Sequence, residues 1–411
     1  MEILRKTYLA QLKRYIDIPL VKVITGIRKS GKSTLLKQFK AYLENELKIQ
    51  HQYLIYFEFD DESQKLPYKS LQLTELIKSR IIDNQRYYIF LDEIQLVENF
   101  QKTINSLLKL KNVDLYITGS NAYMFSSKIS TLLTGKTIDV HVLPFSFKEY
   151  SVLFKDLETD KRFQQYLIYG GMPGISIFKD DNPAIKQYLK MIFNDILVKD
   201  ILNRHSINNT NEFINIAKYL YNTIGNIVSI RNIVNYLKSN NLSEISEPTS
   251  SNYVLWLLES LLLYKVNFSR IKGKQLLSNL SKYYVPDIGL RNAIIDDYVL
   301  SDIGSTLANI VYLELLRRGY VITVGHEQRK KEIDFVAIKN DYVVYIQVAQ
   351  YLIEENRKRE IGNLLSINDN HDKMILSLDL VSGRTKEGII LKNIVDWLLE
   401  ENTELEVKKH V

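Results

Sequence analysis

Residues 21–36 read VKVITGIRKSGKSTLL, and the predicted fold is built outward from this stretch. The first five residues form a β-branched run that is typical of a buried strand. The next eight, GIRKSGKS, have the glycine and lysine spacing of a phosphate-binding loop, and the last residues begin a helix. Glycines let successive backbone N–H groups turn toward a polyphosphate, and the helix N-terminus adds partial positive charge. The sequence therefore favours a nucleotide site over a chance glycine turn between a strand and a helix.

The loop predicts ATP and Mg²⁺ as cofactors. In such a loop Lys32 reaches the β- and γ-phosphates, and the hydroxyl of Ser33 is a ligand of Mg²⁺. The residues expected to contact the nucleotide are Gly26, Ile27, Arg28, Lys29, Ser30, Gly31, Lys32, Ser33, Thr34 and Asp92.

A second motif follows a wholly apolar strand predicted at 87–91, which ends in Asp92 and Glu93. Downstream of a phosphate loop this is a Walker-B-type strand, in which Asp92 would hold Mg²⁺ through water and Glu93 would polarise the attacking water. The alternative is a strand that merely ends in two acids. Ser120 and Asn121 end the next predicted strand and could contact the γ-phosphate, although an ordinary turn has the same composition. The predicted catalytic residues are Glu93, Lys32 and Asn121.

ATPases of this kind often receive an arginine from a neighbouring subunit, which stabilises the transition state. An oligomer is therefore compatible with the sequence. The candidate cations are Arg28, Arg162, Arg204 and Lys136, which the sequence alone does not rank.

Three domains are predicted, and the first is α/β. Strands alternate with helices over residues 1–150, which predicts a parallel sheet with helices on both faces and the site at the carboxyl edge of its strands. Residues 151–300 are almost all helical and end in three helices and a hairpin, the winged-helix pattern. Residues 301–411 return to a mixed α+β pattern that we expect to be nuclease-like.

Composition narrows the class of protein. The chain of 411 residues is 45% hydrophobic and contains no cysteine, which excludes disulfides and thiolate metal sites. No signal peptide opens the sequence, and no apolar stretch is long enough to span a bilayer, so we expect a cytoplasmic protein without membrane contact. A net charge of +6 permits nucleic-acid contact without demanding it.

The hairpin after the three helices is basic. No acidic residue lies between Glu259 and Asp287. Such a wing suits contacts with a phosphate backbone, while a solvated hairpin or a domain interface would look the same. The predicted DNA-binding residues are Arg270, Lys272 and Lys274.

The last third of the chain carries an acid on a predicted helix, Glu314, and Asp334 and Gln347 on paired strands. An acid on one strand and E/Q-x-K on the next is the arrangement of metal-dependent nucleases, whose lysine helps to activate water. Here the lysine position is Ala349. We therefore expect a vestigial site, in which Glu314, Asp334 and Gln347 could hold Mg²⁺ but no water is activated.

Together, GIRKSGKSTLL, FLDEIQ, ITGSN, LPFSFKEY, YGGMPG and IVYLELLRRGY with EIDFVA resemble prokaryotic AAA-type ATPases that carry a C-terminal domain of unknown function similar to PD-(D/E)xK nucleases. The resemblance covers nearly the whole chain. It implies Lys32 and Ser33 on nucleotide and Mg²⁺, Asp92 and Glu93 as the Walker B pair, and Asn121 as a sensor. The chain departs from the pattern at Lys136, where relatives often have arginine, and at residues 347–349, where many keep E-x-K.

Three functions follow as hypotheses. The first is an ATP-hydrolysing switch or motor that acts on DNA or on a protein partner. The second is a non-catalytic DNA-binding regulator with a structural nucleotide. The third is an ATP-controlled nuclease. Steady ATP turnover separates the first from the second, and metal-dependent strand cleavage would single out the third.

Overall fold

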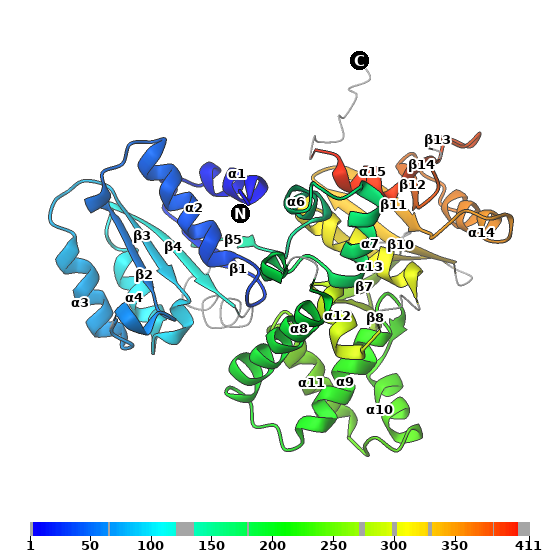
Figure 1. The fold of residues 1–411 in the computed structure, drawn as a ribbon, viewed down its shortest axis with the longest axis horizontal. Coiled ribbons are helices and arrows are strands. Elements are labelled where there is room, and N and C mark those ends of the chain that lie inside the picture. The colour runs from blue at the N-terminus through cyan, green and yellow to red at the C-terminus, as the bar shows by residue number, and fades with distance from the viewer. Residues whose placement is uncertain are drawn as a thin grey trace. The chain divides into compact units, whose positions relative to one another are not determined.

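The computed structural model describes residues 3–64, 66–120, 135–178, 181–270, 276–297, 302–327, 331–380 and 382–401 (Figure 1). These residues form two compact units. The first comprises Met1–Pro144 with the short segments Val198–Ile201 and Glu259–Leu261, and the second comprises the remainder of the chain. None of the helices in the described ranges combines the length and apolar character needed to cross a bilayer.

The first unit is built on a five-stranded sheet of order β2-β3-β4-β1-β5, in which every pairing is parallel. The strand predicted at the start of the phosphate loop, β1, therefore lies inside the sheet and is separated from β3 by β4. The predicted parallel α/β fold is confirmed. The strands are β1 (Val21–Thr25), β2 (Leu54–Glu58), β3 (Tyr87–Asp92), β4 (Val113–Gly119) and β5 (Thr137–His141).

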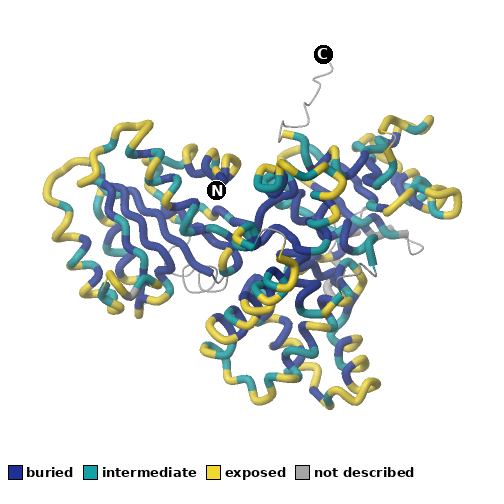
Figure 2. The backbone as a smooth tube through the Cα atoms, viewed as in Figure 1, coloured by how far each residue is buried: buried dark blue, intermediate teal, exposed yellow. Residues whose placement is uncertain are grey.

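Helices cover both faces of this sheet, because successive residues of each strand point to opposite sides. Tyr87, Ile89 and Leu91 of β3 pack with the apolar residues of α3 (Ser70–Arg80) and α4 (Phe100–Leu107). Tyr88 and Phe90 pack on the other side with α1 (Lys6–Arg14) and α2 (Lys32–Asn45). The strands accordingly form the buried centre of the unit in Figure 2. The apolar layers on the two faces of the sheet thus fix the positions of the carboxyl ends of its strands relative to one another.

The second unit begins with helices and ends in a mixed sheet. The helical part of this unit contains α6 (Phe147–Leu153), α7 (Thr159–Tyr169), α8 (Asn182–Ile196), α9 (Thr210–Asn222), α10 (Ile230–Ser239), α11 (Glu247–Glu259) and α12 (Ile288–Ile295). Short helical turns lie at η5 (Pro173–Phe178) and at the π-helical η6 (Leu197–Leu202).

Nine strands make one sheet of order β13-β14-β12-β11-β10-β9-β7-β8-β6. The predicted wing hairpin is β7 and β8, and β7 also pairs in parallel with β9, so the hairpin is continuous with the C-terminal strands. The strands are β6 (Ile227–Val228), β7 (Tyr264–Arg270), β8 (Leu276–Tyr284), β9 (Val321–Glu327), β10 (Lys331–Lys339), β11 (Tyr342–Val348), β12 (Asp372–Ser377), β13 (Gly383–Arg384) and β14 (Ile390–Asn393). The remaining helices are α13 (Ile303–Arg317), α14 (Glu354–Leu365) and α15 (Ile394–Leu399).

The predicted division at 300–301 falls within this second unit, because strands on both sides of that position share the sheet. The hydrophobic pattern distinguishes helix-rich from strand-rich segments, but it does not indicate which strands pair with each other. The three-domain division therefore stays a prediction, and the described contacts group the chain into two units.

Close backbone packing explains the glycine pair Gly170-Gly171 within the helical region. A Cβ on Gly170 would lie 2.2 Å from Oδ1 of Asp287, and its φ of +69° favours glycine in any case. Asp287 accepts hydrogen bonds from the backbone N–H of Gly171 at 2.6 Å and of Leu290 at 3.0 Å. One buried carboxylate therefore joins the end of α7 to the start of α12.

Candidate nucleotide site

The phosphate-loop sequence adopts the conformation that a phosphate cradle requires. Gly31 precedes α2 in the left-handed region with φ of 97°, and Lys29 also has a positive φ of 66°. A Cβ on Gly26 would lie 2.2 Å from the backbone oxygen of Val142, so only glycine fits there. The hydroxyl of Ser30 is buried and has no hydrogen-bond partner among the described residues. The loop is thus strained and carries an unsatisfied donor, as expected for a backbone shaped around a ligand.

Lys32, the cation of the loop, is almost wholly buried. Its Nζ donates to the backbone oxygen of Ile27 at 3.3 Å and lies 3.5 Å from Oε1 of Glu93. Lys32 follows β1 and Glu93 follows β3, and β4 lies between these two strands. The predicted phosphate-binding cation and the predicted base nevertheless lie close together. A phosphate entering the loop would offer Lys32 a stronger partner than a backbone carbonyl.

Asp92, at the end of β3, is fully buried and held on both oxygens. Thr118 of β4 donates its hydroxyl to Oδ1, and Tyr56 of β2 donates to Oδ2 at 3.0 Å. Burial raises the pKa of Asp92, while hydrogen bonds from Thr118 and Ser33 act in the opposite direction. The contact between Ser33 and Asp92 places the two predicted Mg²⁺ ligands side by side.

Glu93 sits in the left-handed conformation with φ of 54°. Its backbone N–H donates to Oγ1 of Thr118 at 2.8 Å, and Gln95 donates to its carboxylate. Burial acts to raise the pKa of Glu93, but the charges of Lys32 and Arg28 outweigh it, so this pKa lies below its ordinary value. The carboxylate is therefore held ionised and oriented, which a general base requires.

Arg28 at the tip of the loop is not a free surface charge. Its Nε and Nη2 donate to the two oxygens of Asp200, each at 3.0 Å. Ser120, at the end of β4, donates its hydroxyl to the same carboxylate at 3.2 Å. Asp200 lies in η6, in the segment that groups with the first unit.

Two further residues support the loop and were not expected from the sequence. The guanidinium of buried Arg5 donates to the backbone oxygens of Ser30 at 3.0 Å and Leu143 at 2.8 Å. His141, at the end of β5, contacts Oγ1 of Thr25 through Nδ1 at 3.1 Å. Burial and the charge of Lys32 lower the pKa of His141 to about 4, so the ring is neutral at pH 7.

These residues fit a nucleotide with Mg²⁺. Gly26 leaves the loop free of a Cβ, the buried Ser30 hydroxyl is unsatisfied, and the cation of Lys32 is buried in the loop. The hydroxyl of Ser33 contacts the carboxylate of Asp92. In the part of the chain that the structure describes, no group of three or more His, Cys, Asp or Glu side chains could hold a metal by protein ligands alone. Such a site matches Mg²⁺, which takes few protein ligands and several phosphate or water oxygens.

Other predicted site residues lie elsewhere. Asn121, Lys272 and Lys274 fall outside the described residues, and of Arg270 only the backbone, in β7, is described. Arg162 donates to the backbone oxygen of Ser151 at 3.1 Å and to Thr159 at 2.7 Å, within the second unit. Lys136 is exposed beside β5.

The predicted vestigial metal set is only partly assembled. Oε1 of Gln347 accepts from the backbone N–H of Asp334 at 2.8 Å, whereas Glu314 forms ion pairs with Arg317 at 3.3 Å and Arg318 at 2.9 Å. A buried lysine from β8, Lys282, contacts Oε1 of Glu332 at 2.5 Å and Oδ1 of Asp334 at 3.4 Å. An ammonium group from a distant part of the sequence thus bridges this acid pair and offsets one of its two negative charges.

Comparisons with known proteins agree with the first unit's fold. A family model described as an AAA domain matches residues 19–151, and a model described as a domain of unknown function (DUF8612) matches residues 160–301. An uncharacterized protein of Haemophilus influenzae is 36% identical over 401 residues, which cover 96% of this chain and 98% of that protein. An uncharacterized protein of Methanocaldococcus jannaschii is 32% identical over 371 residues, which cover 85% of this chain and 80% of its own.

Among solved structures, a Walker-type ATPase of Pyrococcus abyssi matches with a TM-score of 0.51 and 16% identity. The match covers 71% of this chain and 96% of that one. At this identity the likeness concerns the fold alone.

Proposed function

The chain belongs to the same family as the Haemophilus influenzae relative, and an AAA-domain model matches its residues 19–151, so we propose that it binds ATP with Mg²⁺ and hydrolyses it. The observation that carries this proposal is the approach of Lys32 to Glu93 at 3.5 Å, beside the contact between Ser33 and the buried Asp92. A phosphate cation, a base and two ligands for Mg²⁺ then meet at one edge of the sheet. Phosphoryl transfer to water needs these parts.

Each residue has one role in this proposal. Backbone N–H groups of residues 26–33 and Nζ of Lys32 bind the phosphates and orient the γ-phosphoryl group. Glu93, kept ionised by Lys32 and Arg28, accepts a proton from the attacking water. Thr118 fixes both Asp92 and the backbone of Glu93, so it acts as a positioning residue. When bound at Ser33 and Asp92, Mg²⁺ neutralises charge that develops on the phosphate oxygens.

The experiment compares Glu93→Gln with Lys32→Ala in ATP binding and in turnover. Glutamine keeps the size of Glu93 but removes the basic carboxylate, so binding should persist while turnover falls by roughly 10²–10⁴-fold. Lys32→Ala removes the buried cation and should weaken binding itself by about tenfold or more. Near wild-type turnover in folded Glu93→Gln would reject Glu93 as the base.

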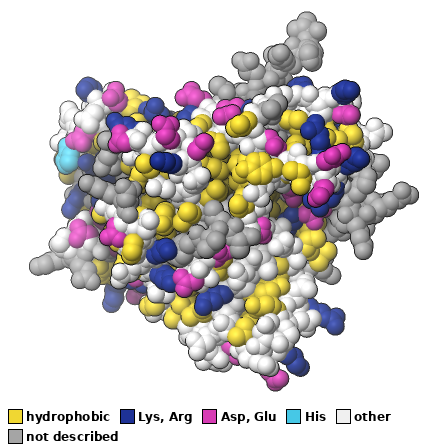
Figure 3. All heavy atoms as spheres, turned by 45° about the vertical axis from the view of Figure 1, so that its right-hand side comes forward, with side chains coloured by type: hydrophobic (Ala, Val, Ile, Leu, Met, Phe, Trp, Pro, Cys, Tyr) yellow, Lys and Arg dark blue, Asp and Glu magenta, His cyan; other side chains and the backbone are white. Residues whose placement is uncertain are grey.

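We extend the proposal to a nucleotide-driven switch or motor that acts on DNA or on a protein partner. The basic hairpin sequence around Arg270, Lys272 and Lys274 supports contact with a phosphate backbone. On the face drawn in Figure 3, basic and acidic side chains are interspersed, so that face shows no extended single-sign surface. ATP turnover with and without duplex or single-stranded DNA tests the choice, because stimulation favours DNA and an unchanged rate favours a protein partner.

A further inference from the structure

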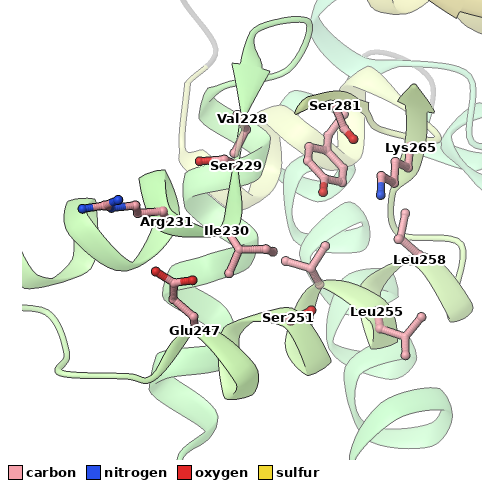
Figure 4. Close-up of a pocket in the computed structure, with 12 residues that line it drawn as sticks. Val228, Ser229, Ile230, Arg231, Glu247, Ser251, Leu255, Leu258, Lys265 and Ser281 are labelled. Carbon is pink, nitrogen blue, oxygen red and sulfur yellow. The ribbon is translucent and has the colours of Figure 1, made fainter. Parts of the chain in front are cut away.

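A cavity of about 630 Å³ lies in the second unit, between the hairpin β7–β8 and helices α10 and α11. Figure 4 shows Lys265 and Ser281 on the strand side, and Ile230, Ser251 and Leu255 on the helix side. A volume of this size falls within the range of small-molecule sites. The cavity is unrelated to the nucleotide site, whose residues belong to the first unit.

The strand side of the cavity presents unused hydrogen-bond donors. Ser281 and Tyr283 are two residues apart on β8 and therefore share a face, and they are only 4% and 5% exposed. Both side chains line the cavity, and neither hydroxyl has a hydrogen-bond partner among the described residues. The two oxygens remain accessible from the cavity, so both hydroxyls are available to donate to a ligand that enters it.

An exposed lysine on the neighbouring strand adds a positive charge to the same side of the cavity. Lys265 of β7 is paired with Tyr283 across the hairpin, and it forms no ion pair with any described residue. Burial raises the pKa of Tyr283, so its hydroxyl keeps its proton and acts as a donor. The strand side therefore offers one positive charge and two hydroxyl donors to an anion.

The helix side adds both charge and apolar surface. The cavity is lined by Ser229, Ile230 and Arg231, which form the N-terminal end of α10. Backbone N–H groups at that end favour negative charge. Arg231 and Glu247 lie at the same end of the cavity in Figure 4 and offset each other in charge. The rest of the helix side is aliphatic, with Val254, Leu255 and Leu258.

We propose that this cavity binds a small organic phosphate whose body is apolar or aromatic. The capping box of Ser229 and Asn232 occupies two backbone N–H groups of α10, so the donors left are Lys265, the hydroxyls of Ser281 and Tyr283, and the N–H groups of Ile230 and Arg231. These donors suit the three oxygens of a phosphate group. The aliphatic side chains of α11 cover the body of the ligand and exclude water from it. The site takes one phosphate group and one ring-sized apolar group.

The probe is phenyl phosphate, titrated into the full-length chain and followed by ligand-observed NMR and calorimetry. The background is Lys32→Ala, so that the phosphate loop of the first unit contributes less to the signal. Phenyl phosphate should bind, and Tyr283→Phe and Lys265→Met should each weaken binding by roughly tenfold or more, since each removes a hydrogen bond to a charged group. Matched controls on α10, Tyr236→Phe and Lys238→Met, lie outside the cavity lining and should leave the affinity unchanged.

Two companion ligands separate the parts of the proposal. Benzoate carries the ring with a carboxylate, and inorganic phosphate carries the anion without a ring, so both should bind more weakly than phenyl phosphate. Equal or tighter binding of benzoate would overturn the phosphate assignment. Equal binding of inorganic phosphate would overturn the apolar part. Absence of phenyl phosphate binding, or binding insensitive to Tyr283→Phe, would overturn the site.

Discussion

Arg28 and Asp200 form a two-point ion pair across 172 residues of sequence, with Nε to Oδ2 and Nη2 to Oδ1 both at 3.0 Å. The carboxylate is fully buried, while the guanidinium is 16% exposed. The arginine that the sequence offered as a candidate for a neighbouring subunit is therefore engaged within its own chain. The pair ties the tip of the phosphate loop to η6.

Breaking this pair from one side should cost more than removing both charges. Arg28→Ala removes both guanidinium hydrogen bonds from the buried carboxylate of Asp200, and we expect a loss of roughly 1.5–3 kcal/mol in the free energy of unfolding. Adding Asp200→Asn removes the buried charge that Arg28 paired with and should recover part of that loss. Urea unfolding of the two single variants and the double variant measures the coupling. Additive losses would show that the pair contributes no interaction of its own.

Thr118 offers a second test, because one hydroxyl serves two residues of the site. It donates to Asp92 and accepts from the backbone N–H of Glu93 at 2.8 Å. Thr118→Val keeps the shape but leaves the buried N–H of Glu93 unpaired, which should cost roughly 1–3 kcal/mol of stability. If Glu93 shifts as a result, ATP turnover should fall by up to about 10²-fold. Thr118→Ser is the control, since it retains the hydroxyl and should stay near wild type in both measurements.

The C-terminal acids lead to a negative prediction. The ammonium group of Lys282 already pairs with Glu332 and Asp334, and Ala349 provides no amine to steer a water. Hence we expect no cleavage of DNA or RNA with Mg²⁺ or Mn²⁺, with or without ATP. Incubation with labelled duplex and single strands, resolved on denaturing gels, checks this. Metal-dependent cutting that disappears in Asp334→Ala would contradict it, and would make Lys282 the missing lysine of the site.

The nucleotide site could be predicted from the sequence because its parts are local. The site is predicted by the glycine spacing, a lysine and a strand that ends in two acids, and each of these signals lies within a few residues of sequence. Parallel strands then bring these residues to one edge of the sheet. Asp200 and Lys282 could not be found in this way. Each depends on a contact between segments far apart in the chain, Asp200 with Arg28 and Lys282 with Asp334. The sequence shows each of them only as a charged residue within an apolar segment. Such a pattern does not indicate which residue of opposite charge it pairs with.

The wing prediction shows the same limit for strands. The pattern identified the hairpin β7–β8 correctly, since alternation and turn residues are local. It missed the parallel pairing of β7 with β9, which joins the hairpin to the C-terminal strands in one sheet. Parallel neighbours are separated by long connections, and the sequence carries no mark of which edge receives them.

Asp287 gives a pH-dependent prediction that concerns the second unit. Burial raises the pKa of Asp287 from 3.8 to about 6, although backbone N–H groups of Gly171, Leu290 and Gly289 act against this rise. The folded state therefore holds this proton more tightly than the unfolded state. As pH rises from about 4 to about 6 the unfolded chain has already lost the proton, so the free energy of unfolding should fall. At 1.36 kcal/mol per unit of pKa difference, the loss is on the order of 3 kcal/mol.

Asp287→Asn isolates this contribution, because asparagine does not titrate and the other groups of the chain are shared. Urea unfolding of both proteins between about pH 4 and pH 7 should show the wild type losing stability relative to the variant as pH rises. Asparagine also turns an N–H toward one of the backbone donors, which an amide nitrogen cannot accept. A protonated Asp287 keeps an acceptor on both oxygens, so the variant should be less stable than the wild type at about pH 4. A stability difference that stays constant with pH would mean that the three backbone N–H groups hold the pKa of this carboxyl at its ordinary value in spite of its burial.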